Sequence, residues 1–154
     1  MKKIYPCVVG LGYVGLPLFV RLKNKFSTIG FDINKDRVGY LLKKQDQNKE
    51  FSKNDLILKN NSIITNNVKN IKKANFFIVT VPTPVNQKFE PDLKFLKDAV
   101  TIIGKNLKKD DIIFIESTIY PSVTQNFCIP ILERESKLKI NKDFIIGYSS
   151  ERIN

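Results

Sequence analysis

The sequence of 154 residues contains no histidine and only two cysteines, Cys7 and Cys128. The residue types that usually bind transition metals are therefore scarce, and no CxxC pair occurs, so nothing in the sequence predicts a metal site. Cys7 falls in an expected strand and Cys128 in an expected helix. We therefore interpret both as buried, inert thiols and not as nucleophiles.

Long apolar runs are missing as well, and no stretch is long and apolar enough to cross a membrane. The first residues resemble a signal peptide, because Met1–Lys3 is basic and an apolar run continues to Val20. Pro6, Pro17 and three glycines interrupt that run, and no small-residue cleavage site follows it. We therefore expect a cytoplasmic protein with no membrane partner and with reduced cysteines.

Acidic residues are few, with 15 Asp and Glu against 26 Lys and Arg, which gives a formal net charge of +11. A basic balance of this size is typical of nucleic-acid-binding proteins. Here, however, the lysines are scattered along the whole chain among asparagines and isoleucines. We interpret them as solvated surface and expect no nucleic-acid partner, although a basic field would help to attract an anionic nucleotide.

A glycine-rich motif follows the first apolar run and opens an expected helix. The first glycine allows a tight turn, the second lets the backbone approach a pyrophosphate, and the third lets the helix pack closely. The N-terminus of the helix then offers unpaired N–H groups to phosphates. The alternative is a plain turn between a strand and a helix. The residues of the motif are Gly10, Leu11, Gly12, Tyr13, Val14 and Gly15.

An acidic residue, Asp32, ends the next apolar run about 20 residues after Gly10. Its carboxylate can accept hydrogen bonds from both ribose hydroxyls and repels a 2′-phosphate, so NAD is favoured over NADP. Arg37 lies one turn into the following helix, on the side of the cofactor's adenosine. An ordinary exposed arginine is the alternative interpretation.

Strand-like apolar runs alternate with helix-like segments along the chain. We expect strands at residues 4–9, 28–33, 62–65, 76–81, 111–116 and 144–148. Helices are expected at 13–25, 34–44, 67–73, 92–103 and 121–137, and residues 45–61 are irregular apart from a helical turn around Leu56. The alternation predicts the α/β class, with a doubly wound parallel sheet (Rossmann fold) of six strands, helices on both faces, and one domain over residues 1–154.

The chemistry is expected on four loops at the carboxyl edge of this sheet: Gly10–Gly15, Val81–Val85, Glu116–Thr118 and Ser149–Glu151. The Thr118 hydroxyl could hold a water or the substrate near the nicotinamide, or it could only cap a turn. Glu151 could act as a general acid or base if a second domain partly desolvates it. Otherwise it is a solvated carboxylate.

Several spaced motifs together resemble the N-terminal domain of the UDP-sugar 6-dehydrogenases, over the whole chain. The form of the Thr118 motif and the Glu151–Asn154 ending are similar to the UDP-N-acetylhexosamine branch, including the Vi-polysaccharide type, more than to the UDP-glucose branch. The motifs are GLGYVGLP at Gly10–Pro17, FDIN with Arg37, VPTPV at Val81–Val85, ESTIYP at Glu116–Pro121, CIPILE at Cys128–Glu133 and YSSERIN at Tyr148–Asn154.

The resemblance implies oxidation of a sugar C6 alcohol to a carboxylate by two hydride transfers to NAD, through a thioester on a cysteine. The glycine motif would hold the pyrophosphate, and Asp32 and Arg37 the adenosine ribose. Thr118 would lie near the reacting carbon, with Glu151 as the acid/base between the nicotinamide and the substrate. The residues implied to line the cofactor are Val81, Pro82, Thr83, Pro84, Val85, Ser117 and Thr118.

The family's catalytic cysteine, a lysine and most of the surface that binds the UDP-sugar substrate belong to middle and C-terminal regions that do not appear in this sequence. We therefore expect the chain to bind NAD without completing the oxidation alone, and full-length relatives to form homodimers or larger assemblies that feed polysaccharide synthesis. Ser122 and Ser150 stand where the family usually has glycine and proline, which bears on Thr118 and Glu151. A 3-hydroxyacid or 6-phosphogluconate dehydrogenase domain and a nucleotide-binding module without catalysis are the alternatives.

Overall fold

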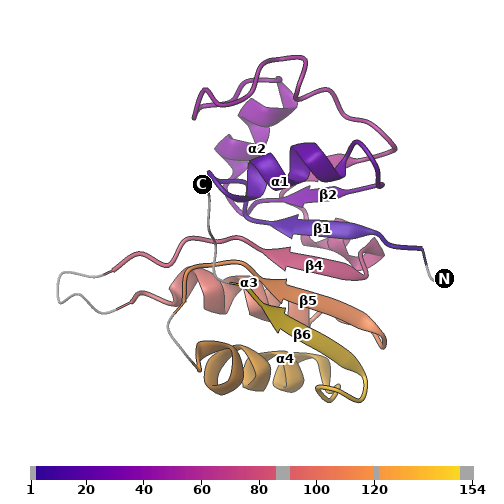
Figure 1. Cartoon of the computed structure of the whole chain (residues 1–154), viewed down its shortest axis with the longest axis vertical. Helices are drawn as coiled ribbons and strands as arrows, with labels where there is room; N and C mark the ends of the chain where they lie inside the picture. The colour runs from indigo at the N-terminus through magenta and orange to yellow at the C-terminus, as the bar shows by residue number, and fades with distance from the viewer. Residues whose placement is uncertain (1–2, 86–90, 120–121, 150–154) are drawn as a thin grey trace.

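The computed structural model describes residues 3–85, 91–119 and 122–149. These residues form one parallel sheet in the order β3-β2-β1-β4-β5-β6 (Figure 1). The chain builds the sheet outward from β1 to β3 and then returns to β4 on the other side of β1. This order confirms the predicted doubly wound α/β fold. The strands are β1 (Pro6–Val9), β2 (Ile29–Phe31), β3 (Ile63–Thr65), β4 (Phe76–Val79), β5 (Asp111–Ile115) and β6 (Phe144–Tyr148).

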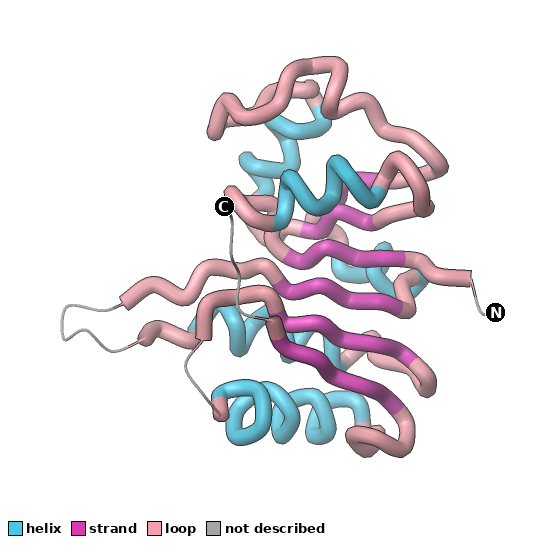
Figure 2. The backbone as a smooth tube through the Cα atoms, viewed as in Figure 1, coloured by secondary structure: helices cyan, strands magenta, loops and turns pink. Residues whose placement is uncertain are grey.

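Helices cover both faces of the sheet, as Figure 2 shows. One core packs under α1 (Gly15–Leu22) and α2 (Lys35–Leu42), and a second under α3 (Lys94–Gly104), α4 (Ile129–Ser136) and the 3₁₀-helix η1 (Val68–Lys73). Side chains of β4 alternate between the cores, with Ile78 in the first and Phe77 and Val79 in the second. A continuous apolar run is therefore what this strand needs. None of the described helices has the length and apolar character of a membrane span.

Local sequence signals explain where several elements begin. Pro6 is the first residue of β1, where its missing N–H costs the sheet least. Pro17 lies in the first turn of α1, whose N–H groups have no partner within the helix. The Asn34 side chain caps α2 by accepting hydrogen bonds from the N–H groups of Asp36 and Arg37 at 3.0 and 3.1 Å. The start of α2 is thus the one predicted, whereas α1 is shorter at both ends than residues 13–25.

The helix predicted from Pro121 to Lys137 is not a uniform α-helix. Pro121 lies outside the described residues, and the residues from Thr124 to Cys128 form a π-helical segment, η2, ahead of α4. Pro130 follows as the second residue of α4. A proline inside a helix has no N–H to donate, and a wider π turn before it accommodates the loss. The apolar periodicity predicted the helix but not this irregularity, which depends on Pro130.

The irregular segment 45–61 packs against α1. Leu56 is buried in the core under α1 and α2. The buried Lys23 ammonium, just after α1, donates a hydrogen bond to the Ile57 carbonyl at 2.9 Å. The predicted helical turn around Leu56 is a single turn, in which the Leu56 N–H donates to the Ser52 carbonyl at 3.3 Å. Lys23 and Leu56 together fix the segment beside the N-terminal half of the sheet.

Candidate cofactor site

A cavity of about 380 Å³ lies at the carboxyl ends of β1, β2 and β4. The strand order reverses between β1 and β4, and open α/β sheets bind their ligands at that point. Its lining includes residues 10–13 of the glycine loop, Asp32, Val81 with Pro82, and Phe95 of α3. Gln47 and Asn48 of segment 45–61 also line it. The cavity has the position that a dinucleotide occupies in this fold.

Each glycine of the motif occupies a place with its own steric demand. Gly10 has a φ of +99°, in the left-handed region, and its N–H donates to the Phe31 carbonyl at 2.8 Å. A Cβ on Gly15 would lie 1.8 Å from the Gly10 carbonyl oxygen, so α1 can approach the loop only without a side chain there. A Cβ on Gly12 would meet nothing within 4 Å. The space over Gly12 therefore suits a phosphate that approaches the backbone.

Thr80 holds this loop in place, although the sequence analysis gave it no role. The hydroxyl of the buried Thr80 lies 2.8 Å from the Gly10 carbonyl and 3.2 Å from the Val9 carbonyl, and its single proton is shared between the two acceptors. The sequence signal for this role was a hydroxyl-bearing residue at the end of an otherwise apolar strand. Thr80 thus joins the end of β4 to the turn after β1.

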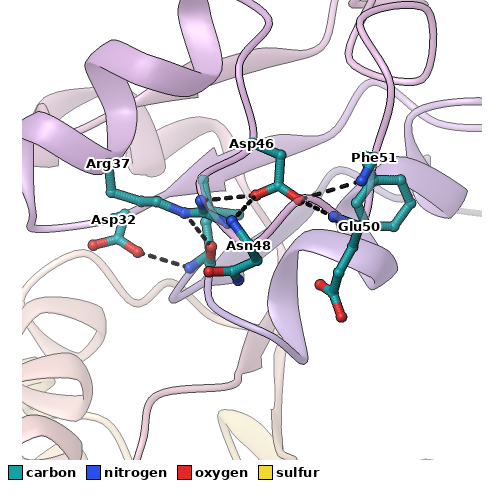
Figure 3. Close-up of polar contacts among 7 residues, drawn as sticks. Asp32, Arg37, Asp46, Asn48, Glu50 and Phe51 are labelled. Carbon is teal, nitrogen blue, oxygen red and sulfur yellow. Dashed lines mark hydrogen bonds and ion pairs between the residues drawn. The ribbon is translucent and has the colours of Figure 1, made fainter.

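Asp32 is joined to the glycine loop by its carboxylate. One oxygen, Oδ2, accepts a hydrogen bond from the Leu11 N–H at 2.8 Å (Figure 3). The other, Oδ1, accepts one from the Asn34 N–H at 2.9 Å. Each carboxylate oxygen can accept a further bond, so both remain able to receive a ribose hydroxyl. Asp32 therefore lies directly beside the glycine motif.

Arg37 is 8% exposed, so the interpretation as an ordinary exposed arginine is wrong. Its Nε donates to the Leu11 carbonyl at 2.8 Å, and its Nη1 donates to Asp46 Oδ1 at 2.9 Å (Figure 3). Its Nη2 is buried and has no hydrogen-bond partner among the described residues. Arg37 lines the cavity, although its Nη2 is itself buried.

Asp46, which the sequence analysis missed, binds Arg37 from the other side. Its carboxylate also accepts hydrogen bonds from the N–H groups of Asn48 at 3.1 Å, Glu50 at 2.9 Å and Phe51 at 3.3 Å. Burial alone raises the pKa of Asp46, but the bonds from the Glu50 N–H, Arg37 and the Asn48 N–H hold that pKa below its usual value. The residue is therefore a charged anchor for its own segment.

Two further loops meet at the other end of the site. The buried Ser117 hydroxyl donates to the Val81 carbonyl at 2.6 Å, and the Thr83 hydroxyl donates to the Thr118 carbonyl. The Thr118 residue itself is exposed. Two side-chain hydroxyls, each bound to a backbone carbonyl of the other loop, therefore join the two predicted loops.

The predicted site residues divide into three groups. Those that line the cavity are Gly10, Leu11, Gly12, Tyr13, Asp32, Arg37, Val81 and Pro82. Those that do not line it are Val14, Gly15, Thr83, Pro84, Val85, Ser117 and Thr118. Glu151, together with Ser150, lies outside the described residues. Ser122 has a φ of +72°, in the region that favours glycine.

Both cysteines are buried, as the sequence predicted. Burial raises the pKa of the Cys7 thiol well above its ordinary value and that of Cys128 to about 12. Neither thiol is a thiolate at neutral pH, and only the thiolate is a good nucleophile. Within the described ranges, no three His, Cys, Asp or Glu side chains are grouped to hold a metal ion.

A doubly wound sheet with a glycine loop, a helix N-terminus and a carboxylate after β2 defines an NAD-binding dehydrogenase domain. The comparisons give the family. Residues 3–154 match the NAD-binding domain of the UDP-glucose/GDP-mannose dehydrogenase family, and the chain belongs to this family. Its cofactor is NAD. The site fits NAD, because the space over Gly12 is open to a pyrophosphate and the Asp32 carboxylate can accept further hydrogen bonds from a ribose.

Two of the similar relatives carry the name UDP-N-acetyl-D-glucosamine 6-dehydrogenase. The chain is 47% identical over 154 residues to a UDP-N-acetyl-D-glucosamine 6-dehydrogenase of Pseudomonas aeruginosa, covering 100% of this chain and 36% of the relative. It is 44% identical over 147 residues to the enzyme of that name in Salmonella typhi, covering 96% of this chain and 35% of the relative. The chain thus spans about a third of the length of these relatives.

The solved structures agree with the sequence comparison. The UDP-D-ManNAc dehydrogenase of Pyrococcus horikoshii superposes with a TM-score of 0.88 at 26% identity, over 98% of this chain and 37% of that one. The UDP-N-acetyl-mannosamine dehydrogenase Cap5O of Staphylococcus aureus gives 0.85 at 27% identity, over 97% of this chain and 37% of that one. The fold and the family assignment therefore rest on independent comparisons.

Proposed function

We propose that this chain is the cofactor-binding part of an enzyme that oxidises the C6 alcohol of a UDP-N-acetylhexosamine to the carboxylate. The observation that carries the proposal is the 47% identity, over the whole chain, to a UDP-N-acetyl-D-glucosamine 6-dehydrogenase. The carboxylate product of this enzyme would serve polysaccharide synthesis in the cytoplasm. The complete reaction would belong to a protein of the relatives' length, because the chain spans 36% of that relative.

The adenosine ribose would be held by Asp32 and Arg37, which share contacts with Leu11. The pyrophosphate would lie over Gly12, at the N-terminus of α1, where unpaired N–H groups and the helix dipole favour an anion. A 2′-phosphate beside the Asp32 carboxylate would meet a like charge. NAD is therefore the preferred form of the cofactor.

The reacting end would be formed by residues 81–85 and 117–118, which hydrogen bonds join. When bound, NAD accepts a hydride from C6 in each of the two oxidations. Thr118 would hold a water or the substrate near the reacting carbon, and Glu151 would take the proton of the C6 hydroxyl. Val81 and Pro82 line the cavity and would exclude water from one side of the nicotinamide.

Calorimetric titration with NAD and NADP tests the cofactor assignment. We expect NAD to bind and NADP to bind at least about tenfold more weakly, because of the charge of Asp32. An Asp32→Ser variant should bind NAD more weakly and lose most of the discrimination. Equal affinities of the two cofactors for the unaltered chain would overturn the role of Asp32.

Fusion to the remaining two thirds of the Pseudomonas relative tests the substrate assignment. The chain alone should give no steady NADH production from UDP-N-acetyl-D-glucosamine, because both of its cysteines are buried. The fusion should give NADH with a UDP-N-acetylhexosamine but not with a 3-hydroxyacid or 6-phosphogluconate. Steady turnover by the chain alone, or a fusion that binds NAD yet acts only on the latter substrates, would contradict the proposal.

A further inference from the structure

Segment 46–51 is organised by one carboxylate. The Asp46 side chain is 0% exposed, although the flanking residues Gln45 and Gln47 are exposed. Three backbone N–H groups of the segment donate to it, those of Asn48, Glu50 and Phe51. The residues from Gln47 to Glu50 are polar, and Phe51 at the end of the segment packs against the core under α1 and α2. The Asp46 carboxylate and Phe51 therefore fix the path of the segment together.

The same carboxylate restrains an arginine of the cofactor site. Asp46 Oδ1 accepts from Arg37 Nη1 at 2.9 Å, while Arg37 Nε is held by the Leu11 carbonyl at 2.8 Å. Two of the three guanidinium nitrogens are thus fixed, which sets the plane of the group. The third, Nη2, is buried and has no acceptor among the described residues.

The organised segment also forms part of the cavity wall. Gln47 and Asn48 line the cavity together with Asp32, Ile33 and Arg37. These residues follow β2 in the chain and lie on the β2 side of β1, whereas Val81 follows β4 on the other side of β1. A ligand group that fills this side of the cavity therefore touches a wall whose shape depends on Asp46.

We propose that Asp46 is a positioning residue for the adenosine half of NAD: it orients Arg37 and presents Gln47 and Asn48 as direct contacts to that adenosine. The proposal rests on NAD binding at the glycine loop. The amide side chains of Gln47 and Asn48 offer both donors and acceptors to the base or its ribose.

Calorimetry with ADP-ribose, which carries the adenosine half without the nicotinamide, measures the effect directly. Asp46→Asn should lower the affinities for ADP-ribose and for NAD by the same factor, about tenfold, because the Arg37 guanidinium loses its charged partner. The matched control is Asp55→Asn, an exposed carboxylate of the neighbouring turn that bonds Ser52. This control should leave both affinities within about twofold of the unaltered chain.

A double-mutant cycle with Arg37→Ala separates positioning from general support of the fold. If part of the effect of Asp46 passes through Arg37, the double variant loses less ADP-ribose affinity than the product of the two single losses. Losses that multiply in full would contradict that route. Gln47→Ala changes an exposed side chain and should not lower the thermal unfolding midpoint. It should nevertheless lower the affinity for ADP-ribose about threefold.

The outcomes also distinguish this proposal from the cofactor assignment. If the unaltered chain binds neither NAD nor ADP-ribose, both are wrong. If it binds both ligands and Asp46→Asn binds them equally well, only the positioning role is wrong. If Asp46→Asn fails to fold, Gln47→Ala decides: unchanged ADP-ribose affinity in that variant would overturn the proposed contact.

Discussion

The two ends of the candidate site are held by different means. At the adenosine end, charged side chains are fixed to the backbone, since Asp32 and Arg37 both bind Leu11 and Asp46 binds Arg37. At the reacting end, the Ser117 and Thr83 hydroxyls bind backbone carbonyls, and the Thr118 residue is exposed. The chain therefore preorganises charge at one end of the site and only the backbone path at the other.

This difference indicates where each part of the chemistry can be tested. The proposed adenosine contacts come from side chains whose partners lie within the described chain. At the reacting end, by contrast, Pro84 and Val85 are exposed, as Thr118 is. We expect adenosine binding to survive in isolation, and we expect the reacting end to need contacts from the remainder of a protein of the relatives' length.

The largest effect is expected for Gly15→Ala at the adenosine end. The new Cβ would lie 1.8 Å from the Gly10 carbonyl oxygen and 2.4 Å from the Thr80 hydroxyl, so α1 or the loop must move. We expect a loss of more than about 3 kcal/mol in urea unfolding, together with loss of NAD binding. The matched control is Gly12→Ala, which should keep the stability and lose only NAD affinity. Equal stability of the two variants would contradict the close packing of α1.

Arg37→Ala should come next, because it leaves the buried Asp46 carboxylate without its cation. Three N–H groups still bind that carboxylate, so we expect a loss of about 2 kcal/mol, below the range for a fully unpaired buried charge. Urea unfolding at neutral pH measures it. A loss below about 0.5 kcal/mol would place the pair among ordinary surface ion pairs.

Acid should remove the contribution of Asp46 to the free energy of unfolding. The pKa of Asp46 is lower in the folded chain than its usual value, so its stabilisation is present above the unfolded-state pKa. That stabilisation is lost as the pH falls through the folded-state pKa. The difference in unfolding free energy between the unaltered chain and Asp46→Asn should be constant from about pH 8 to 5 and shrink below about pH 4. A difference that grows on acidification would reverse the sign of the argument.

Thr83→Val tests the reacting end, where it removes the hydrogen bond to the Thr118 carbonyl. We expect a loss of about 1 kcal/mol in unfolding free energy, the usual value for one hydrogen bond. ADP-ribose affinity, measured by calorimetry, should not change. A parallel fall in ADP-ribose affinity would show that the two ends are coupled.

Ser122→Gly should give the smallest change, and a favourable one. Ser122 has a φ of +72°, which costs a residue with a Cβ more than it costs glycine. We expect a gain of about 0.5 kcal/mol, reduced by the extra freedom of glycine in the unfolded chain. The thermal midpoint measures it, and Ser122→Ala is the control that should give no gain.

The sequence predicted those parts of the molecule whose cause is local. The six strands followed from apolar runs, the start of α2 from Asn34, and the glycine turn from its motif, because each signal acts within a few residues. Asp46 and Thr80 could not be found in that way. Their roles depend on Arg37 and Gly10, which approach them only after the sheet has formed.

Segment 46–51 has a consequence for the dynamics of the site. The amide protons of Asn48, Glu50 and Phe51 all end on the Asp46 carboxylate, so no one of them is protected by a helix or a sheet. If that carboxylate leaves, all three bonds open in one event. Hydrogen exchange at these amides should therefore share a single opening free energy, lower than that of the β1 and β4 amides and raised in common when ligand binds.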